Sequence, residues 1–226
     1  MPGIEQLTRT IIRCKKCPRL VRWCRQVTEK PPPRHQGKTY WGKPLPGFGD
    51  PDGRLLIVGL APAAHGANRT GRMFTGDRSG DWLYDTLCSF GFANQPTSVQ
   101  RDDGLRLKNC YITAAVRCAP PGNKPAKVEF YNCRPYLVQE LQLLKSVRVV
   151  IALGKIAFDS FLSAYRESGG VIPKPRPQFH HAGSIRLRSD LTLLASYHPS
   201  QQNTFTGKLT CKMFHAVFKK AKAMVE

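Results

Sequence analysis

The sequence predicts an α/β protein with a mainly parallel β-sheet that is covered by helices on both faces. Short apolar runs alternate with segments that carry apolar residues at helical spacing, which is typical of strand–helix–strand units. The run 147–153 is apolar enough for a strand buried on both faces. Small and polar residues directly follow three of the apolar runs, at 59–77, 117–123 and 198–208. Ligands bind at the carboxyl ends of parallel strands, so these three segments should meet at one edge.

Most of the expected strands are apolar runs that stop at glycine, proline or polar residues. The strands cover residues 54–59, 109–116, 147–153, 184–188 and 192–197. Helices are expected where apolar residues recur every three or four positions, as Leu137, Leu141 and Leu144 do. The helices lie within 1–28 and at 80–90, 127–145, 155–165 and 212–224. Residues 29–50 are rich in proline and glycine and are expected to form a loop.

Composition limits the class of protein and the kind of partner. A chain of 226 residues with 41% apolar residues fits one domain over 1–226, with 1–50 as an N-terminal loop segment that carries cysteines. The net charge is +20, from 35 Lys and Arg against 15 Asp and Glu, and it is spread along the chain. This favours a nucleic acid over a membrane surface, which usually needs a basic amphipathic helix. The sequence shows no signal-peptide pattern and no run of 18 apolar residues, so we expect a cytoplasmic, nucleoid-associated monomer.

The segment 59–77, GLAPAAHGANRTGRMFTGD, has the composition of a pocket for an aromatic ring. Its small residues let backbone N–H groups approach a flat or anionic ligand. Phe74 offers a stacking face, and Asp77 offers a charge. Asp77 also precedes a predicted helix and can cap it. His65 and Arg69 are expected to line the pocket or to contact phosphate.

A second candidate segment begins at His198, directly after the last strand. Pro199 fixes the backbone behind this histidine, and Ser200 can cap the next turn. Phe205 is an apolar residue in an otherwise polar and basic loop, which suits insertion into stacked bases. The residues of this loop that we expect to contact DNA are Ser200, Gln201, Gln202, Asn203, Phe205 and Lys208.

Four of the eight cysteines are candidate metal ligands. Cys14 and Cys17 form a CxxC pair, Cys118 follows a strand, and Cys133 lies near a helix start. Four thiolates can hold Zn²⁺ or a [4Fe–4S] cluster, and one CxxC with two dispersed cysteines favours the cluster. The remaining cysteines lie in apolar or helical patterns and are interpreted as packing residues; they are Cys24, Cys88, Cys110 and Cys211.

These segments together resemble the uracil-DNA glycosylase superfamily, and most closely its family five, the iron–sulfur glycosylases of type B. The resemblance rests on 59–77, on NCYITAAVRCAPPGNKP at 109–125, on the four cysteines and on HPSQQNTFTGKLT at 198–210. It implies a three-layer α/β/α fold, a structural [4Fe–4S] cluster on Cys14, Cys17, Cys118 and Cys133, and removal of uracil from single- or double-stranded DNA. Base flipping and cleavage of the N-glycosidic bond would leave an abasic site.

The resemblance also assigns roles to individual residues. Phe74 would stack on the flipped base, and His198 would donate a hydrogen bond to its O2 atom. Asp77 and Asn123 would handle the catalytic water, although Asn123 in PPGNKP also suits a plain turn. Backbone N–H groups of the segment that contains Ala61, Ala63 and Ala64 would bind the base carbonyls.

Alanine occupies three places where relatives carry polar side chains, namely Ala63, Ala64 and Ala114. This favours a roomier pocket that also accepts hypoxanthine or similar purines.

The first alternative function is that of a non-enzymatic nucleic-acid-binding protein with a four-cysteine metal site. An iron–sulfur nuclease or redox enzyme ranks third, because the key motifs contain no paired carboxylates and no phosphate-cradling loop.

Overall fold

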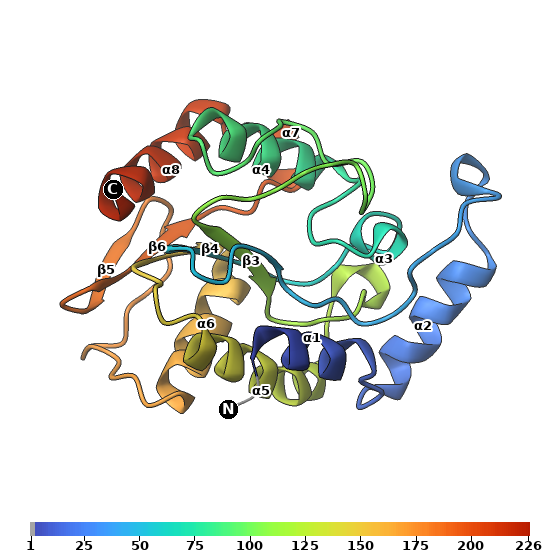
Figure 1. The fold of residues 1–226 in the computed structure, drawn as a ribbon, viewed down its shortest axis with the longest axis horizontal. Coiled ribbons are helices and arrows are strands. Elements are labelled where there is room, and N and C mark those ends of the chain that lie inside the picture. The colour runs from blue at the N-terminus through green and yellow to red at the C-terminus, as the bar shows by residue number, and fades with distance from the viewer. Residues whose placement is uncertain (1–2) are drawn as a thin grey trace.

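In the computed structural model, which describes residues 3–226, a single six-stranded sheet crosses the molecule (Figure 1). The strand order is β1-β3-β2-β4-β6-β5. The four central strands run parallel to one another, and the two edge strands are antiparallel to their neighbours. The strands are β1 (Phe48–Gly49), β2 (Leu55–Gly59), β3 (Cys110–Ala114), β4 (Val149–Leu153), β5 (Ser184–Arg188) and β6 (Leu191–Ser196). The mainly parallel sheet that the sequence predicts is confirmed.

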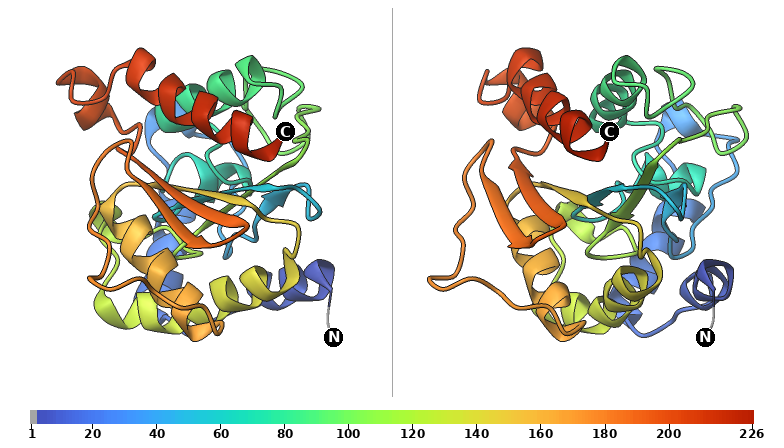
Figure 2. Two further views of the ribbon diagram at one scale, coloured as in Figure 1. Left: turned by 90° about the vertical axis from the view of Figure 1, so that its left-hand side faces the viewer. Right: turned by 60° about the vertical axis from the view of Figure 1, so that its left-hand side comes forward.

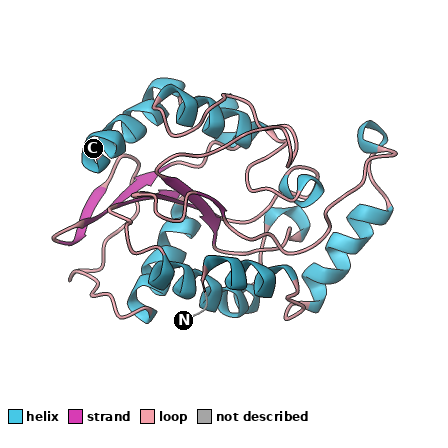
Figure 3. Cartoon of the chain, in the orientation of Figure 1, coloured by secondary structure: helices cyan, strands magenta, loops and turns pink. Residues whose placement is uncertain are grey.

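Helices cover both faces of this sheet (Figures 1 and 2). On one face lie α5 (Lys127–Leu143) and α6 (Lys155–Glu167), with α1 (Ile4–Ile12) packed against α5. On the other face lie α4 (Arg78–Ser89) and α8 (Cys211–Val225), which contact each other. The cartoon in Figure 3 shows the resulting three layers, with the strands enclosed between helices.

Alternation along β2 shows how the apolar run produces two cores. Leu55 and Ile57 belong to the core under α4 and α8, whereas Leu56 and Val58 belong to the core under α5 and α6. Successive side chains of a strand point to opposite faces, so a strand covered on both sides must be apolar at every position. All four of these side chains are fully buried.

The remaining short elements lie in segments for which the sequence predicted loops. They are α3 (Ala67–Thr70), α7 (Gln201–Phe205) and the 3₁₀ turns η1 (Pro33–His35) and η2 (Pro121–Asn123). The N-terminal helical segment is in fact two helices, because α2 (Pro18–Glu29) begins after Cys17. Proline is tolerated at the first position of a helix, so Pro18 starts α2 and leaves Cys14 and Cys17 on the loop before it. Within residues 3–226, none of the helices is both long and apolar enough to cross a membrane.

Candidate active site and cysteine centre

Three segments meet at the carboxyl edge of the sheet, as the order of strands and motifs predicts. Beyond the end of β2, the N–H of Ala115 donates to the carbonyl of Gly59 over 3.0 Å, and the N–H of Val116 donates to that of Leu60 over 2.9 Å. On the other side, Gly154 donates to the carbonyl of Ser196 at the end of β6 over 2.7 Å. These bonds extend the sheet, so the motif segments leave it from one common edge.

Phe74 lies at this edge in a backbone conformation that side chains rarely adopt. Its φ is +54°, and the chain around it is closely packed. A Cβ atom at Gly59 would lie 2.8 Å from the Phe74 ring, and one at Gly80 would collide with the Phe74 carbonyl. The two glycines therefore make room for Phe74 on either side. Such strain is typical of functional segments that the surrounding structure holds in place.

The rings of Phe74 and His198 face each other across the edge. Their centroids are 5.9 Å apart with an angle of 27° between the planes, so two of the three segments contribute to one site. A Cβ atom at Gly154 would lie 3.5 Å from the Cβ of His198, which shows how closely the start of α6 approaches this histidine. The amide of Asn203 donates to the His198 carbonyl over 2.8 Å and fixes the turn that follows β6.

Burial lowers the pKa of His198 to about 4. The ring is therefore neutral at physiological pH, because water no longer stabilises its charged form. Within residues 3–226, no side chain forms a hydrogen bond with either ring nitrogen of His198. A neutral imidazole still carries one N–H group, so His198 can donate a hydrogen bond to a ligand without adding a charge to the site.

Asp77 is the N-cap of α4, and its carboxylate accepts the N–H of Gly80 over 3.1 Å. The expected capping role is thus confirmed. The carboxylate also packs directly against Gly66, where any larger residue would collide with it. Burial raises the pKa of Asp77, while the N–H groups of Gly80 and Ser79 oppose this effect. Asp77 is consequently a stronger base than an exposed aspartate.

The other residues of the 59–77 segment surround this centre in two groups. Ala61 and Ala64 pack against the apolar cluster that contains Cys17, Cys118 and Cys133, which we call the cysteine cluster. The two alanines and Ala63 are all partly buried. His65 Nδ1 forms a 3.0 Å hydrogen bond with the hydroxyl of Tyr40, and Arg69 Nε donates to the His65 carbonyl over 2.9 Å. The segment therefore joins two regions. One is the sheet edge with Phe74, Asp77 and His198, which we call the reactive edge, and the other is the group of four candidate ligand cysteines, which we call the cysteine centre.

Asn123 lies on the loop after β3, in the turn η2, with a φ of +56°. Its side chain is exposed, and it forms no hydrogen bond with another described side chain. This conformation agrees with the turn interpretation of PPGNKP, since asparagine tolerates positive φ better than most residues. Its role towards water stays a prediction.

The segment after His198 divides into residues that shape the turn and residues that face solvent. Ser200 caps α7 by accepting the N–H of Asn203, so the expected cap is confirmed. Gln201, Gln202 and Lys208 are exposed, and Phe205 is 65% exposed with the Arg78 guanidinium 4.6 Å from its ring. The exposed apolar ring that the sequence suggests is therefore present beside a basic side chain.

The four candidate ligand cysteines lie in one region formed by three parts of the chain. Cys17, Cys118 and Cys133 are buried in the same apolar cluster, and Cys14 lies on the adjoining loop beside Tyr136. Burial raises the pKa of Cys118 strongly and that of Cys133 to about 11, and the neighbouring cysteines raise both pKa values further. In the part of the chain that the structure describes, no three of these side chains are close enough to hold a single metal ion.

The cysteines that the sequence assigned to packing do not behave alike. Cys110 and Cys24 are buried, as predicted. Cys24 also lies in the cysteine cluster, where its thiol donates to the carbonyl of Ala119 over 3.6 Å. Cys88 is partly buried. The prediction was wrong for Cys211, which is exposed at the first position of α8 because the apolar side of that helix begins at Phe214.

A buried ion pair that the sequence analysis missed lies behind the cysteines. Arg117 and Glu140 are each 1% exposed in their side chains and form a direct ion pair. The hydroxyl of Thr113 also donates to the Glu140 carboxylate, over 2.6 Å. Among the described residues, Arg117 Nε and Nη1 and Glu140 Oε1 have no hydrogen-bond partner. Unpaired buried polar atoms are costly and require an explanation.

The surroundings of the four cysteines contain charges that act on their thiols. Burial is the main influence on Cys133 and raises its pKa, but the backbone N–H and the positive charge of Arg117 act in the opposite direction. The pair therefore places an incompletely paired cation beside thiols that must lose their protons to bind metal. The adjacency of Arg117 and Cys118 in sequence is the one signal that could have indicated this pair.

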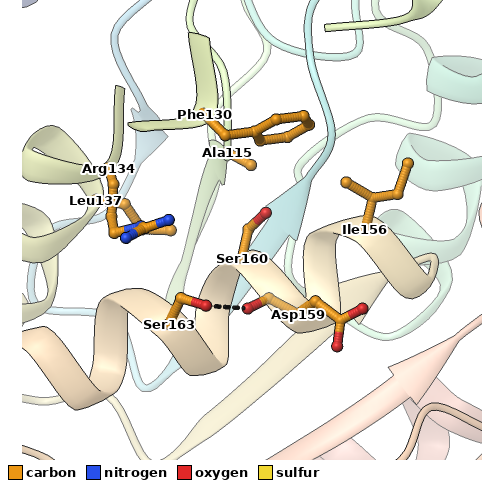
Figure 4. A pocket seen from close by; sticks show the side chains of 8 residues that line it. All are labelled: Ala115, Phe130, Arg134, Leu137, Ile156, Asp159, Ser160 and Ser163. Carbon is orange, nitrogen blue, oxygen red and sulfur yellow. Dashed lines mark hydrogen bonds between the residues drawn. The ribbon is translucent and has the colours of Figure 1, made fainter. Parts of the chain in front are cut away.

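A separate cavity lies between α5 and α6 (Figure 4). Phe130, Arg134 and Leu137 line it from α5, and the lining from α6 includes Ile156, Asp159 and Ser160. Phe130 also packs against the cysteine cluster. Phe74, Asp77 and His198 are not among its lining residues, although Ala115, which lies at the carboxyl edge of the sheet, is one of them.

Comparison with known proteins agrees with this architecture. Residues 46–222 match the model of the uracil DNA glycosylase superfamily. The chain is 48% identical over 98% of its length to the type-5 uracil-DNA glycosylase of Mycobacterium bovis, of which it covers 82%. It is 47% identical over 97% of its length to the type-5 enzyme of Thermus thermophilus, of which it covers 97%. The type-4 uracil-DNA glycosylase of Archaeoglobus fulgidus is 25% identical over 88% of this chain, which covers 83% of that protein.

Proposed function

This chain belongs to the uracil DNA glycosylase superfamily, and we propose from that premise how it acts. It is a uracil-DNA glycosylase, a DNA repair hydrolase that cleaves the N-glycosidic bond of uracil and leaves an abasic site. The observation that carries the mechanism is the contact between the Phe74 and His198 rings at the edge where the half-buried Asp77 lies. Stacking face, hydrogen-bond donor and carboxylate are the groups that a flipped nucleotide needs.

Phe74 binds the flipped base by stacking, a contact worth about 1–3 kcal/mol per base. As the bond between C1′ of the sugar and N1 of uracil breaks, its electron pair moves to the base. The neutral ring of His198 donates its N–H to O2 of uracil, where part of the negative charge develops. A donor aimed at developing charge contributes about 2.7–4 kcal/mol. A charged imidazolium is not required.

Asp77 acts on the other fragment, the sugar, which becomes positively charged. Its carboxylate stabilises this charge and orients the water that attacks C1′. The water oxygen bonds to C1′, and one of its protons passes to Asp77 and then leaves for the expelled base. Burial raises the pKa of Asp77, which makes it a better acceptor for that proton. Asn123, on the loop after β3 at the same edge, is the second residue that we assign to this water.

The cofactor that we propose for the cysteine centre is a [4Fe–4S] cluster on Cys14, Cys17, Cys118 and Cys133. Bound there, it supplies a structural cross-link between the α1–α2 loop, the end of β3 and α5. The sequence pattern supports a cluster over Zn²⁺, because zinc sites more often use two short CxxC loops, whereas here one CxxC pair is combined with two dispersed cysteines. Cys24 is not a ligand in this assignment, because its thiol donates to the carbonyl of Ala119.

DNA is the macromolecular partner of this activity, and we place the enzyme, as a monomer, with chromosomal DNA in the cytoplasm. The exposed side chains of Gln201, Gln202, Phe205 and Lys208 support a contact with the duplex beside the reactive edge. The small side chains of Ala63 and Ala64 support acceptance of hypoxanthine in addition to uracil.

A panel of oligonucleotides tests this function. The purified protein is incubated with single- and double-stranded DNA that contains uracil or hypoxanthine, and abasic sites are then cleaved with alkali. Cleavage at uracil is expected in either context. A protein that binds these oligonucleotides but leaves every site intact would favour the non-enzymatic alternative, and cleavage at uracil alone would exclude hypoxanthine.

A further inference from the structure

A cluster of basic and aromatic side chains lies beside the reactive edge on the loop that joins α2 to β1. Arg34, His35 and Tyr40 come from this loop, and His65 and Arg69 come from the segment after β2. The centroids of the His35 and His65 rings are 6.0 Å apart, and Tyr40 is hydrogen-bonded to His65 over 3.0 Å. Two segments that are distant in sequence thus form one surface.

Backbone hydrogen bonds fix this loop against α3. The N–H of Trp41 donates to the carbonyl of Arg69 over 2.9 Å, and the N–H of Gly42 donates to that of Asn68 over 3.0 Å. These carbonyls lie at the end of α3, where helical partners are missing. The loop is therefore held in register with the segment that carries Phe74 and Asp77.

The cluster borders Asp77 on two sides. His65 directly precedes Gly66, against which the Asp77 carboxylate packs, and the Arg69 guanidinium packs against Gly76, which precedes Asp77. The charge of Arg69 lowers the pKa of Asp77, although burial has the larger effect and raises it. A group bound by the cluster would thus be a direct neighbour of the nucleotide on which Asp77 acts.

The charges of the cluster are of one sign. Within residues 3–226, Arg34, Lys38 and Arg69 form no ion pair with a carboxylate. Burial, and then the charges of Arg69, Lys38 and Arg34, lower the pKa of His35, and burial likewise lowers that of His65. Both rings are therefore neutral hydrogen-bonding groups among three cations. The Nδ1 atom of His35 is buried without a partner, which leaves Nε2 as the nitrogen that a ligand can reach.

We propose that this cluster binds a phosphodiester group of the DNA backbone next to the flipped nucleotide. The inference rests on the proposed function, since it takes the ligand to be the strand that Asp77 attacks. Arg34, Lys38 and Arg69 supply charge, and His35 supplies a hydrogen bond. With Lys208 on the segment after β6, the cluster holds the strand from both sides of the extruded nucleotide. Neutral rings suit this task, because they add donors without raising the net charge around Asp77.

The salt dependence of DNA binding tests this proposal. Fluorescence anisotropy measures the affinity of the full-length holoenzyme for an undamaged duplex and for one with an abasic-site analogue, between about 50 and 200 mM NaCl. Arg34→Ala is expected to reduce the slope of log K against log salt by about 0.9, the value for one lost phosphate contact. Lys208→Ala is expected to do the same from the other side.

Arg166→Ala is the matched control, because Arg166 is an exposed arginine at the far end of α6, about 20 Å of helix from the reactive edge. It removes the same charge and should leave the slope unchanged. His35→Ala removes no charge, so it should weaken binding of the abasic duplex about tenfold at an unchanged slope. The melting temperature of Arg34→Ala should match that of wild type, which shows that the change in slope does not come from loss of the fold.

Equal slopes for wild type, Arg34→Ala and Arg166→Ala would overturn the proposal. The proposal would also be overturned if inorganic phosphate, added at constant ionic strength, abolished the part of DNA binding that depends on Arg34. The cluster would then be a site for free phosphate. These binding measurements need no turnover. A protein that excises no uracil would refute the proposed function, whereas the slopes judge the phosphate site independently.

Discussion

The reactive edge and the cysteine centre share the segment after β2, yet they differ in how completely the chain satisfies its own polar groups. At the edge, the Asp77 carboxylate caps α4 and Asn203 fixes the carbonyl of His198. At the cysteine centre, atoms of Arg117 and Glu140 have no partner among the described residues, and burial raises the pKa of Cys118 and Cys133. Hydrogen bonds within the chain thus order the edge, whereas the unpaired polar atoms behind the cysteines support the metal group that we propose there.

This contrast separates two kinds of mutation. Changes at the edge should alter the chemical step while the fold persists, because other side chains form most of the two cores, although Phe74 packs against the core under α4 and α8. Changes at the cysteines should alter the fold first, because α1, α2 and the end of β3 are joined through that centre. The following experiments test the distinction, beginning with the largest expected effect.

Replacement of a ligand cysteine should have the largest effect. Cys118→Ser is expected to yield protein that lacks iron and brown colour and that unfolds far below the wild-type melting temperature. Metal binding contributes about 10–16 kcal/mol to folding in small zinc sites, so the loss of a ligand can exceed the stability of a whole domain. Iron analysis and thermal melts measure both effects. Cys211→Ser is the control, because Cys211 is exposed on α8 and should keep iron and stability unchanged. Colourless, metal-free and fully stable wild-type protein would contradict the assignment.

Asp77→Asn should produce the next largest effect, in activity alone. Asparagine caps helices as well as aspartate does, so α4 should persist. Burial raises the pKa of Asp77 in the folded protein, so its ionised form destabilises the fold above the ordinary aspartate pKa. The variant should therefore melt at or above the wild-type temperature at neutral pH. Single-turnover excision should fall about 10²–10⁴-fold, with affinity for abasic DNA retained. A wild-type rate would place the water-handling role elsewhere.

His198→Ala is expected to slow single-turnover excision about 10²–10³-fold, since one hydrogen-bond donor to the departing base is lost. In wild-type enzyme the pKa of His198 is about 4, below that of an unfolded histidine, so the neutral ring persists down to that pH. The contribution of the neutral ring to the free energy of unfolding is fully present above about pH 6.5. This contribution declines as the pH falls from there towards 4. Protonation of His198 should therefore cause no decline in the wild-type excision rate near pH 6.5. Any decline seen there should also occur in His198→Ala. His215→Ala, on α8, is the control; an equal loss in that variant would indicate a general effect on folding.

Phe74→Ala should cause the smallest of these changes, about 1–3 kcal/mol in binding of the flipped base. Phe74→Tyr retains the ring and is expected to restore most of the activity. Because Gly59 and Gly80 enclose Phe74, melting temperatures of both variants must accompany the rates. Full activity of a stable Phe74→Ala protein would remove the stacking role.

The sequence predicts the central sheet well, because fully buried parallel strands are unmistakable apolar runs, as β2 and β4 are. It also predicts that the segments after β2 and β6 meet, since parallel strands end at one edge. It does not predict the short helices α3 and α7, which are stabilised by caps and tertiary hydrogen bonds more than by apolar periodicity. The loop before β1 illustrates the same limit: its prolines and glycines indicate irregular structure, but only its hydrogen bonds to α3 bring Tyr40 to His65.

Individual side-chain environments are also beyond the sequence. Cys24 and Cys211 both lie in helical patterns, but one is buried beside the candidate ligands and the other is exposed. The ion pair of Arg117 and Glu140 joins residues 23 positions apart, on different elements. The roles of Asp77, Asn123 and His198 in catalysis remain predictions that the geometry supports to different extents.

The most direct measurement is a crystal structure of the Asp77→Asn variant, which should bind uracil-containing DNA without cleaving it. Our account predicts an extrahelical uracil stacked on Phe74, with a ring nitrogen of His198 about 2.6–3.2 Å from O2 and residue 77 facing C1′ of the sugar. A uracil that stays stacked in the duplex, or one that lies in the cavity between α5 and α6, would contradict it.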